Sequence, residues 1–445
     1  MKKYKKIVIL DSVILYPEHR YRLNQLADEI VEYNTCNTEE EVLERVKGAD
    51  CVISCWVDIT NRVIDENPQI KTIAFWTHAY EHRIDKKYAE SHGIYVPCIP
   101  DYGTDSVAEL AIMGMLNVNS RKETSDIRLI DEDLVMKVAN SIRNFDNNVK
   151  DNLTGHWIHE YVKTGNLKIT DPDYFKEETM KGMTIGLMLS QDNLNNDLIK
   201  ILAEGFKMNV IHCCCDITYT LSASFRPVDN LLKESNIIIY DSNLISEDVK
   251  GKILNGNYID AIDINSIQRK GVSLKGKELG IIGLGRIGAR VAQIATQGFG
   301  MKVKYYSRTR KQELEEKYGI TYSELNDVLS SSEYISFHLP HVGAEDFITK
   351  EMIDMIPPKT TVINVSVGNI FENQEHFLSR FNENDLNGYI DVYRTMPPRQ
   401  ELRARKDFLI STFRLGWRTK STVGLKTHKL ITKLGMANPD VRKDH

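Results

Sequence analysis

The sequence has no excess of positive charge, since 57 Lys and Arg residues stand against 62 Asp and Glu residues in 445, a formal net charge of −5. A nucleic-acid-binding protein needs a cationic surplus to neutralise phosphates, so this class is excluded. Apolar runs approaching the ~20 residues of a membrane-spanning helix are also lacking. The run Ile7–Leu10 after the basic N-terminus stops at Asp11, which fits a buried strand better than a signal peptide. We therefore expect a soluble, cytoplasmic protein without membrane or nucleic-acid partners.

Cysteine is scarce and irregularly spaced, with seven residues at positions 36, 51, 55, 98 and 213–215. An odd number without disulfide-framework or zinc-site spacing fits a reducing compartment. His212 precedes the run of three cysteines, but neighbouring strand residues point to opposite faces, so core packing explains them better than a metal site. We expect no bound metal. With 42% hydrophobic and 27% charged residues, the composition is that of a globular protein of about three domains.

Short apolar segments alternate with polar, helix-length segments over residues 1–118. The expected strands are Ile7–Leu10, Cys51–Ser54, Thr72–Phe75 and Ile94–Val96. Strands separated by helices indicate a parallel α/β sheet. A helix should begin after Asp105 or Ser106, either of which can cap it. Residues 119–176 are polar and irregular, apart from a helical patch at Leu134–Ile142, and we interpret them as a connecting arm.

An internal repeat is the most informative feature of the chain. Residues 181–187 (KGMTIGL) match 275–281 (KGKELGI), and residues 204–210 (EGFKMNV) match 297–303 (QGFGMKV) at a nearly constant spacing. A weaker match relates residues 229–232 to 326–329, each followed by a β-rich segment, Ile237–Tyr240 and Tyr334–Phe337. We predict two copies of one βαβ-type unit.

The second copy carries a glycine motif between an expected strand, Leu279–Ile282, and an expected helix, Ala289–Gly298. In Gly283-Leu284-Gly285-Arg286-Ile287-Gly288, the first glycine permits a tight turn, Gly285 lets the backbone approach a pyrophosphate, and Gly288 allows close packing. The pyrophosphate would lie on the helix N-terminus, where free N–H groups attract an anion. The alternative is a glycine-rich turn without a ligand. We expect a dinucleotide site.

The end of the next strand indicates which dinucleotide binds. An NAD site carries a carboxylate about 20 residues after the motif to accept from the ribose hydroxyls. Residues 303–310 (VKYYSRTR) contain no carboxylate, whereas Ser307, Arg308 and Arg310 offer donors and positive charge suited to a 2′-phosphate. We therefore expect NADP(H) rather than NAD(H), the alternative being solvated loop arginines.

The first copy departs from the motif at the decisive positions. Leu189, Gln191 and Leu194 stand where the second copy has its three glycines, so side chains fill the space that a pyrophosphate needs. We predict that the first copy binds no dinucleotide.

The chain resembles the D-isomer-specific 2-hydroxyacid dehydrogenases, which include phosphoglycerate dehydrogenase and glyoxylate reductase. The resemblance rests on residues 274–276, 283–288, 305–311, 337–340, 361–364 and 388–392, on residues 79–85 and 102–109 of the N-terminal part, and on residues 415–419. It implies that His338, Pro340 and Asp391 complete the cofactor site, with Asp391 reaching the nicotinamide. It further implies a flavodoxin-like substrate domain and dimerisation through cofactor domains.

The three catalytic side chains of that family are replaced here. By the resemblance, the family's Arg corresponds to Val367, its Glu to Met396 and its His to Arg414. An arginine stays protonated and cannot exchange a proton with the substrate oxygen, and losing such a group costs about 10²–10⁴ in rate. Ordinary 2-hydroxyacid dehydrogenase activity is therefore not expected.

Several residues are candidates for the replaced functions. His78, Tyr80 and His82 lie on the loop that in the family faces the nicotinamide, and Tyr393 and Arg414 lie on the cofactor side. For each of them a structural role is the alternative. Arg394, Arg414 and Arg418 could bind an anionic substrate, or could form a solvated rim.

We thus predict an α/β protein with a flavodoxin-like substrate domain (1–118 plus 415–445), an arm (119–176), a degenerate Rossmann copy (177–270) and an intact NADP-binding Rossmann domain (271–414). It would be either a homodimer or an internal pseudo-dimer of cofactor domains. The function expected is an NADP(H)-dependent oxidoreductase that reduces a C=O, C=N or C=C group of a small anionic substrate. The alternatives are a catalytically inactive dinucleotide sensor or scaffold, and a redox-neutral enzyme that retains the nucleotide.

Overall fold

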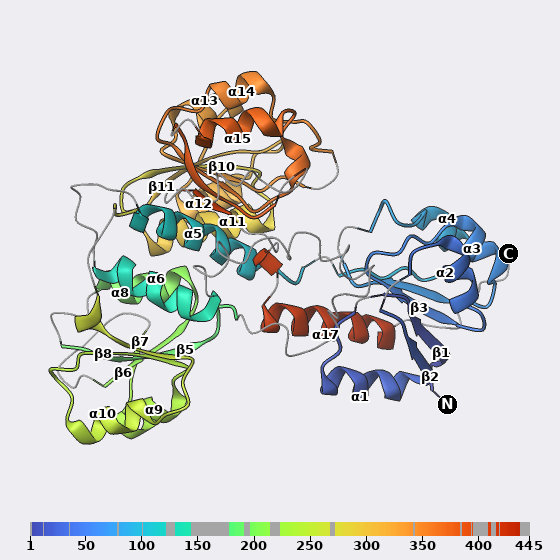
Figure 1. Cartoon of the computed structure of the whole chain (residues 1–445), viewed down its shortest axis with the longest axis horizontal. Helices are drawn as coiled ribbons and strands as arrows, with labels where there is room; N and C mark the ends of the chain where they lie inside the picture. Colours follow the sequence, from blue (N-terminus) through green and yellow to red (C-terminus); the bar gives the residue numbers. More distant parts are fainter. Residues whose placement is uncertain are drawn as a thin grey trace. The chain divides into compact units, whose positions relative to one another are not determined.

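The structure is a computed structural model. It describes residues 2–11, 13–34, 36–77, 80–99, 101–121, 130–143, 178–190, 196–213, 223–267, 272–340, 343–382, 385–392, 394, 408–410, 415–417 and 419–436. These residues form two compact units (Figure 1). Unit 1 contains the described residues of 1–103 and 417–445, and unit 2 contains the described residues of 104–156 and 177–416.

Unit 1 is built on a four-stranded parallel sheet in the order β2-β1-β3-β4. Its strands are β1 (Tyr4–Ile9), β2 (Ala27–Glu32), β3 (Cys51–Ser54) and β4 (Thr72–Phe75). Strands β3 and β4 are buried along their whole length, which fits their mainly apolar sequences. The flanking helices are α1 (Pro17–Leu26), α2 (Glu39–Arg45), α3 (Asn61–Glu66), α4 (Lys86–Ser91) and α17 (Lys420–Met436).

The expected strand Ile94–Val96 does not form. Tyr95 makes an isolated bridge to Thr72, and its N–H donates to the Lys71 carbonyl at 2.9 Å. The segment still follows β4, since the Ile73 and Phe75 N–H groups donate to the carbonyls of Tyr95 and Pro97, both at 3.0 Å, but Pro97 has no N–H with which to return a bond. Strand β2 was not expected, since its sequence ADEIVE is mostly polar and lies at the edge of the sheet.

Unit 2 contains two parallel sheets. The five strands of the first follow the same order as the first five strands of the second. The first sheet has the order β7-β6-β5-β8-β9, and the second has the order β12-β11-β10-β13-β14-β15-β16. The strands of the first are β5 (Thr184–Met188), β6 (Asn209–His212), β7 (Ala223–Phe225), β8 (Ile237–Tyr240) and β9 (Asp260–Asp263). Those of the second are β10 (Glu278–Ile282), β11 (Lys302–Tyr306), β12 (Thr321–Tyr322), β13 (Tyr334–Phe337), β14 (Thr361–Asn364), β15 (Asn387–Ile390) and β16 (Phe408–Ile410).

Helices pack against each sheet and define two halves of unit 2. The five-stranded half has α6 (Ile130–Arg143), α8 (Asn196–Ile199), the π-type turn η3 (Lys200–Gly205), α9 (Val228–Glu234) and α10 (Glu247–Leu254). The seven-stranded half has α5 (Thr104–Arg121), α11 (Arg286–Gln293), the π-type turn η5 (Ile294–Gly298), α12 (Gln312–Tyr318), α13 (Leu325–Ser331), α14 (Lys350–Asp354) and α15 (Gln374–Asn382). The expected helical patch around Leu134–Ile142 is α6, and the helix expected after Asp105 or Ser106 is α5, but it begins at Thr104, so both residues lie in its first turn and neither is its cap.

The first strands of the two halves meet their helices in the same way. A Cβ atom added at Gly186 in β5 would collide with Ser235, and one added at Gly280 in β10 would collide with Ser332. Each serine hydroxyl donates to a carbonyl one turn back, at 2.7 Å for Ser235 and 2.6 Å for Ser332. Close packing of helix on strand therefore requires glycine at both positions.

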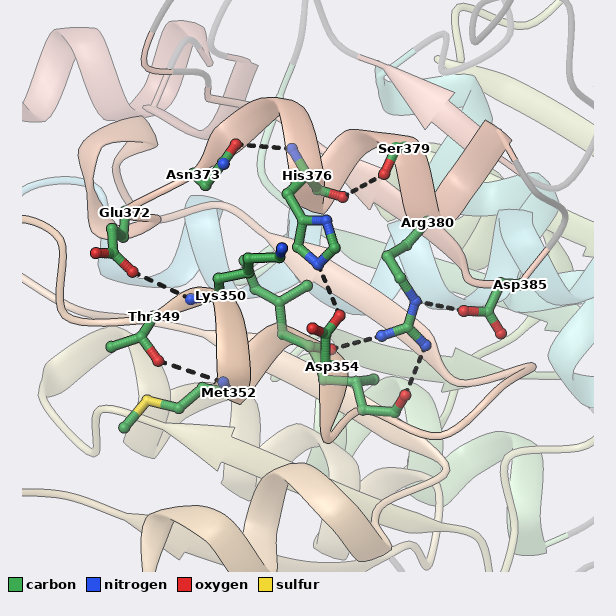
Figure 2. Close-up of polar contacts among 12 residues, drawn as sticks. Thr349, Lys350, Met352, Asp354, Glu372, Asn373, His376, Ser379, Arg380 and Asp385 are labelled. Atoms are coloured by element: carbon green, nitrogen blue, oxygen red, sulfur yellow. Dashed lines mark hydrogen bonds and ion pairs between the residues drawn. The ribbon is translucent and has the colours of Figure 1, made fainter.

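A polar network fastens α14 and α15 to the seven-stranded sheet (Figure 2). The buried Arg380 guanidinium donates to the carbonyls of Ile353 and Ile356 at 2.6 and 2.7 Å and pairs with Asp385. His376 Nε2 lies 2.6 Å from Asp354 Oδ1 on the neighbouring helix. Because these contacts satisfy the free carbonyls at the end of α14, they fix the segments that precede β14 and β15.

Candidate functional site

The glycine motif forms the turn between β10 and α11, next to the point where the strand order reverses. The Gly283 N–H donates to the Tyr306 carbonyl at 2.9 Å, and its φ of +99° lies in the region that favours glycine. A Cβ atom at Gly283 would lie 2.5 Å from the His338 carbonyl oxygen, and one at Gly288 would overlap the Gly283 carbonyl. Both glycines are therefore required by the turn itself.

Gly285 is different, because nothing around it requires glycine. A Cβ atom there would have no neighbour within 4 Å, and its φ of −80° suits any residue. Gly285 is the N-cap of α11 and has no side chain with which to cap it, and a helix N-terminus of this kind favours an anion. Arg286 is exposed and Ile287 half-buried in the first turn. The open space at Gly285 fits the close approach of a pyrophosphate, as the sequence predicts.

The three polar residues after β11 have different surroundings. Ser307 donates to the Thr309 carbonyl at 2.6 Å. Arg310 donates from Nε and Nη2 to the two Glu315 oxygens, at 2.9 and 2.8 Å, which lowers the pKa of Glu315. Arg308 is exposed and forms no hydrogen bond or ion pair within the part of the chain that the structure describes. Of the two predicted phosphate-binding arginines, Arg308 is therefore the one whose charge is available.

His338 lies at the end of β13 and faces the glycine turn. The backbone N–H of His338 donates to the Ile282 carbonyl at 2.8 Å, and its ring Nε2 lies 2.8 Å from Ser336 Oγ. Its Nδ1 is buried and has no hydrogen-bond partner within the described ranges. Burial lowers the pKa of His338 to about 3, so the ring is neutral and offers one unused nitrogen. Pro340 follows on the exposed side of the loop.

Asp391 follows β15 at the same edge of the sheet. It is 2% exposed, and its carboxylate accepts from Tyr389 Oη at 3.1 Å and from the Gly416 N–H at 3.2 Å. Val367, after β14, packs against the hydrophobic core of this half. The structure thus brings the predicted cofactor residues of β10, β11, β13 and β15 to the carboxyl edge of one sheet, where open α/β sheets bind ligands.

At the corresponding edge of the five-stranded half, the described residues after β5, β8 and β9 are buried or bonded to one another. Leu189, which follows β5, is buried at 4% exposure. Asn265 Nδ2 donates to Asp241 Oδ1 at 2.8 Å and to Asp263 Oδ1 at 3.1 Å, which joins the ends of β8 and β9. Gln191 and Leu194 lie outside the described residues, as do Cys214 and Cys215. Among the described residues, no group of three or more His, Cys, Asp or Glu could hold a metal ion.

The candidate substrate-site residues differ in their surroundings. Tyr80 is 6% exposed and stacks on Phe75 with ring centroids 5.4 Å apart, so it is a core residue of unit 1, and burial raises the pKa of its hydroxyl. His82 is exposed. Arg394 pairs with Asp346 at 2.6 Å and donates to the Phe371 carbonyl at 3.1 Å, which ties it to its own half. His78, Tyr393, Arg414 and Arg418 lie outside the described residues.

Unit 1 contains a buried charged cluster that sequence reasoning missed. Lys426 Nζ lies over three rings, 3.5 Å from the centroid of Trp76, 4.6 Å from Trp417 and 4.7 Å from Tyr102. Lys426 is 2% exposed, so these cation–π contacts replace much of its hydration. The signal was present in the sequence, because Lys426 lies within the apolar stripe of α17, between Val423 and Leu430.

Asp11 is the second charge in this cluster, at the carboxyl end of β1. Its carboxylate accepts from the backbone N–H groups of Cys55 and Trp56 at 2.7 and 2.6 Å. Burial raises the pKa of Asp11 to about 6, against the opposing effect of those hydrogen bonds and of Arg83 and Lys426. The cluster places a titratable group and a fixed cation at the edge of the sheet where α/β folds bind ligands.

Comparison with known proteins places the glycine turn in a family context. Residues 252–413 match the model of the D-isomer specific 2-hydroxyacid dehydrogenase family, NAD binding domain. The chain is 44% identical over 104 residues to glyoxylate reductase of Thermococcus litoralis, covering 23% of this chain and 31% of that protein. It is 43% identical over 93 residues to glyoxylate reductase of Aeropyrum pernix, covering 21% and 28%. The chain thus spans about a third of the length of these relatives.

Solved structures share the fold of nearly the whole chain. One is described as a D-isomer specific 2-hydroxyacid dehydrogenase, NAD-binding, from Polaromonas sp. JS6 66, with 20% identity, a TM-score of 0.57 and 98% of both chains covered. Another is an acyclic imino acid reductase in complex with NADPH and D-Arg, with 17% identity, a TM-score of 0.54 and coverage of 96% and 94%. No helix among the described residues has the length and apolarity to cross a membrane.

Replacing Gly285 separates binding from folding. We expect Gly285→Val to leave the melting temperature within about 2 °C, because its Cβ meets nothing, while weakening nicotinamide dinucleotide binding at least ~10-fold. Calorimetric titration and thermal melting measure the two quantities. The control Gly251→Ala, at an equally open glycine in α10, should leave binding unchanged. Undiminished affinity of the Gly285 variant would disprove the assignment of the loop.

Asp11 should make unit 1 less stable as pH rises. Between pH 4 and 6 the folded state holds a proton that the unfolded chain, with a carboxyl pKa of 3.8, has released, so the free energy of unfolding falls across this window. The shift of about two units corresponds to roughly 3 kcal/mol. Asp11→Asn removes this contribution, so the stability difference between wild type and variant should move in the variant's favour by a similar amount from pH 4 to 7. Urea unfolding followed by tryptophan fluorescence measures it, and a difference independent of pH would contradict the prediction.

Proposed function

We propose that this chain is an NADP(H)-dependent oxidoreductase of a small anionic substrate, with altered catalytic residues, because residues 252–413 match the model of the D-isomer specific 2-hydroxyacid dehydrogenase family, NAD binding domain. The observation that carries the proposal is the turn at Gly283–Gly288, where glycine is required by packing at two positions and open space remains at the third. Such a turn at the N-terminus of a helix is built for a pyrophosphate.

The residues present fit a nicotinamide dinucleotide. The N-terminal N–H groups of α11 would hold the pyrophosphate, and the unused His338 Nδ1 and the Asp391 carboxylate follow β13 and β15 at the same edge of the sheet, with β14 between them. When bound, the nicotinamide supplies or accepts a hydride. His338 is neutral above about pH 3, so it orients a polar group of the ligand without adding positive charge.

The preference for NADP(H) rests on the end of β11. No carboxylate follows β11 in residues 303–311 to accept from a ribose 2′-hydroxyl. Arg308 is exposed and Ser307 lies beside it, which suits a 2′-phosphate. Arg310 contributes less, because Glu315 already neutralises its charge through two hydrogen bonds.

The substrate chemistry must differ from that of an ordinary 2-hydroxyacid dehydrogenase. Val367, in the position that the family resemblance gives to the carboxylate-binding Arg, is apolar and packs on the core. Arg414, in the position of the acid/base His, cannot exchange a proton at physiological pH. Reduction of a carbonyl, C=N or C=C group with another proton donor remains compatible with these residues. The imino acid reductase among the structural neighbours makes C=N substrates a natural part of the test.

His78, His82 and Tyr393 remain the proposed proton donors, because Tyr80 is committed to the core of unit 1. Of these three, His82 is exposed on the segment between β4 and α4. An exposed imidazole is a side chain of the kind used in general acid catalysis.

A second function is favoured by the apolar residue at position 367, since a protein that only senses or presents the dinucleotide needs no substrate-binding Arg. Such a protein would be a nucleotide sensor or scaffold. It would bind NADP(H) as tightly as the enzyme but turn over no substrate. A redox-neutral enzyme that retains the nucleotide would behave in the same way in a redox assay.

The decisive experiment is NADPH binding by fluorescence, followed by NADPH oxidation against a panel of carbonyl acids, imines and enoates. We expect binding, slow or absent turnover of glyoxylate, hydroxypyruvate and pyruvate, and turnover of another panel member. Absence of any binding would overturn the cofactor assignment. Binding without turnover on the whole panel would favour the sensor or redox-neutral alternatives.

Cofactor selectivity should depend on Arg308 far more than on Arg310. Arg308→Ala should weaken NADPH binding about 10- to 100-fold, the usual effect of losing a charge-assisted hydrogen bond, and leave NADH binding nearly unchanged. Arg310→Ala, the matched comparison, should change NADPH affinity less than about 3-fold because Glu315 holds that side chain. Fluorescence titration with both dinucleotides tests this, and an equal loss for NADPH and NADH would contradict it.

A further inference from the structure

The two halves of unit 2 meet through residues that correspond to each other in the internal repeat. Gly205 ends η3 and Gly298 ends η5, and these glycines occupy matching positions in EGF and QGF. A Cβ atom on Gly205 would lie 3.0 Å from the Cα atom of Gly298, and one on Gly298 would lie 3.1 Å from the Cα atom of Gly205. The next residues, Phe206 and Phe299, pack edge to face with ring centroids 6.0 Å apart.

Helices α5 and α6 show the same reciprocity. Asn117 Nδ2 lies 3.3 Å from Asn140 Oδ1, and Asn140 Nδ2 lies 3.4 Å from Asn117 Oδ1. The two helices lie between the sheets of unit 2 (Figure 1), where α5 packs on α11, β14 and β15 and α6 packs on α8 and β9.

Two buried glutamates cross between the halves in opposite directions. Glu109 on α5 accepts from the N–H groups of Met180 and Lys181, at 2.8 and 3.1 Å, just before β5. Glu132 on α6 accepts from Ser273 Oγ and the Leu274 N–H, at 2.6 and 3.0 Å, just before β10. Met180 and Leu274 each precede the Lys-Gly pair that opens the two copies of the repeat. Each helix therefore packs on one half, while its glutamate binds the residues just before the first strand of the other half.

This pattern is that of an isologous interface. Around a two-fold axis, residues on the axis contact their own equivalents, and every contact off the axis occurs twice in exchanged form. Gly205 with Gly298, and Asn117 with Asn140, are contacts of the first kind. The crossed bonds of Glu109 and Glu132 are contacts of the second kind. Chance packing of two different domains has no reason to produce both.

We propose that the five-stranded half takes the place of a second subunit within one chain, so that the protein is a monomer with an internal pseudo-dimer and one dinucleotide site. The stoichiometry rests on the proposed function, whereas the oligomeric state does not. The surface that would pair with a second copy of the seven-stranded half is already covered.

The interface also supports the cofactor turn. Arg290, on α11, donates from Nη1 to the Gly205 carbonyl at 2.8 Å and from Nε to Asp105 Oδ1 at 2.8 Å. Asp105 Oδ2 in turn lies 2.6 Å from Lys181 Nζ of the five-stranded half. The five-stranded half thus holds the helix whose N-terminus would receive the pyrophosphate, and Arg290 is a positioning residue.

Light scattering of the full chain tests the oligomeric state. We expect a mass near 51.0 kDa at all concentrations up to the millimolar range. A particle of twice that mass would overturn the proposal. Calorimetric titration with NADPH should give one site per chain, and two sites would also overturn it. A monomer that binds no dinucleotide would leave the pseudo-dimer standing and refute the cofactor assignment instead.

Substitutions at the interface test whether it supports the cofactor turn. Arg290→Met should weaken NADPH binding about 5-fold or more without changing NADPH-to-NADH selectivity, while Arg290→Lys recovers part of the affinity. Glu132→Gln, which keeps one acceptor oxygen, should lower the melting temperature, and the control Glu313→Gln on exposed α12 should not. Unchanged affinity in Arg290→Met, with the melting temperature also unchanged, would overturn the supporting role.

Discussion

Unit 2 depends on the burial of two carboxylates, those of Glu109 and Glu132. An ionised carboxylate away from water must accept hydrogen bonds, and the donors here are the free N–H groups that precede β5 and β10. Each bond therefore satisfies a buried charge and an unpaired backbone group at once. Because each glutamate lies on the helix of one half and its donors on the other, neither half can satisfy its own polar groups alone.

This constraint extends to the cofactor turn. Glycine at 205 and 298 lets η3 and η5 approach until their backbones touch, and Arg290 then reaches the Gly205 carbonyl. Arg290 lies within one turn of Gly288, whose missing Cβ lets α11 pack against the preceding turn. The interface and the glycine turn thus both hold the same short helix. A site of this kind needs a rigid support, because an anion bound by backbone N–H groups depends on their exact direction.

Local patterns predicted the strand, turn and helix around the glycine motif because their requirements are local. Glycines that permit a turn, a following helix and arginines after the next strand all lie within one βαβ segment. The unit 1 cluster could not be predicted in this way, since Lys426 meets Trp76 and Tyr102 from a helix more than three hundred residues later. The loop position of Tyr80 predicts a substrate-site residue, but its ring stacks on Phe75, a contact that depends on the tertiary core. Arg310 likewise fits a phosphate-binding pattern in the sequence, but in the structure its side chain pairs with Glu315, one turn into α12.

The two halves separate the glycines that serve packing from those that serve a ligand. Gly186 and Gly205 of the five-stranded half match Gly280 and Gly298, and in both halves these positions have no room for a side chain. At the turn after the first strand the halves differ, since buried Leu189 stands where Gly283 makes its tight turn. A half that had lost all constraint would lose both sets of glycines. Retention of the packing glycines alone is what a domain needs when its binding role has ended and its role as a structural partner continues.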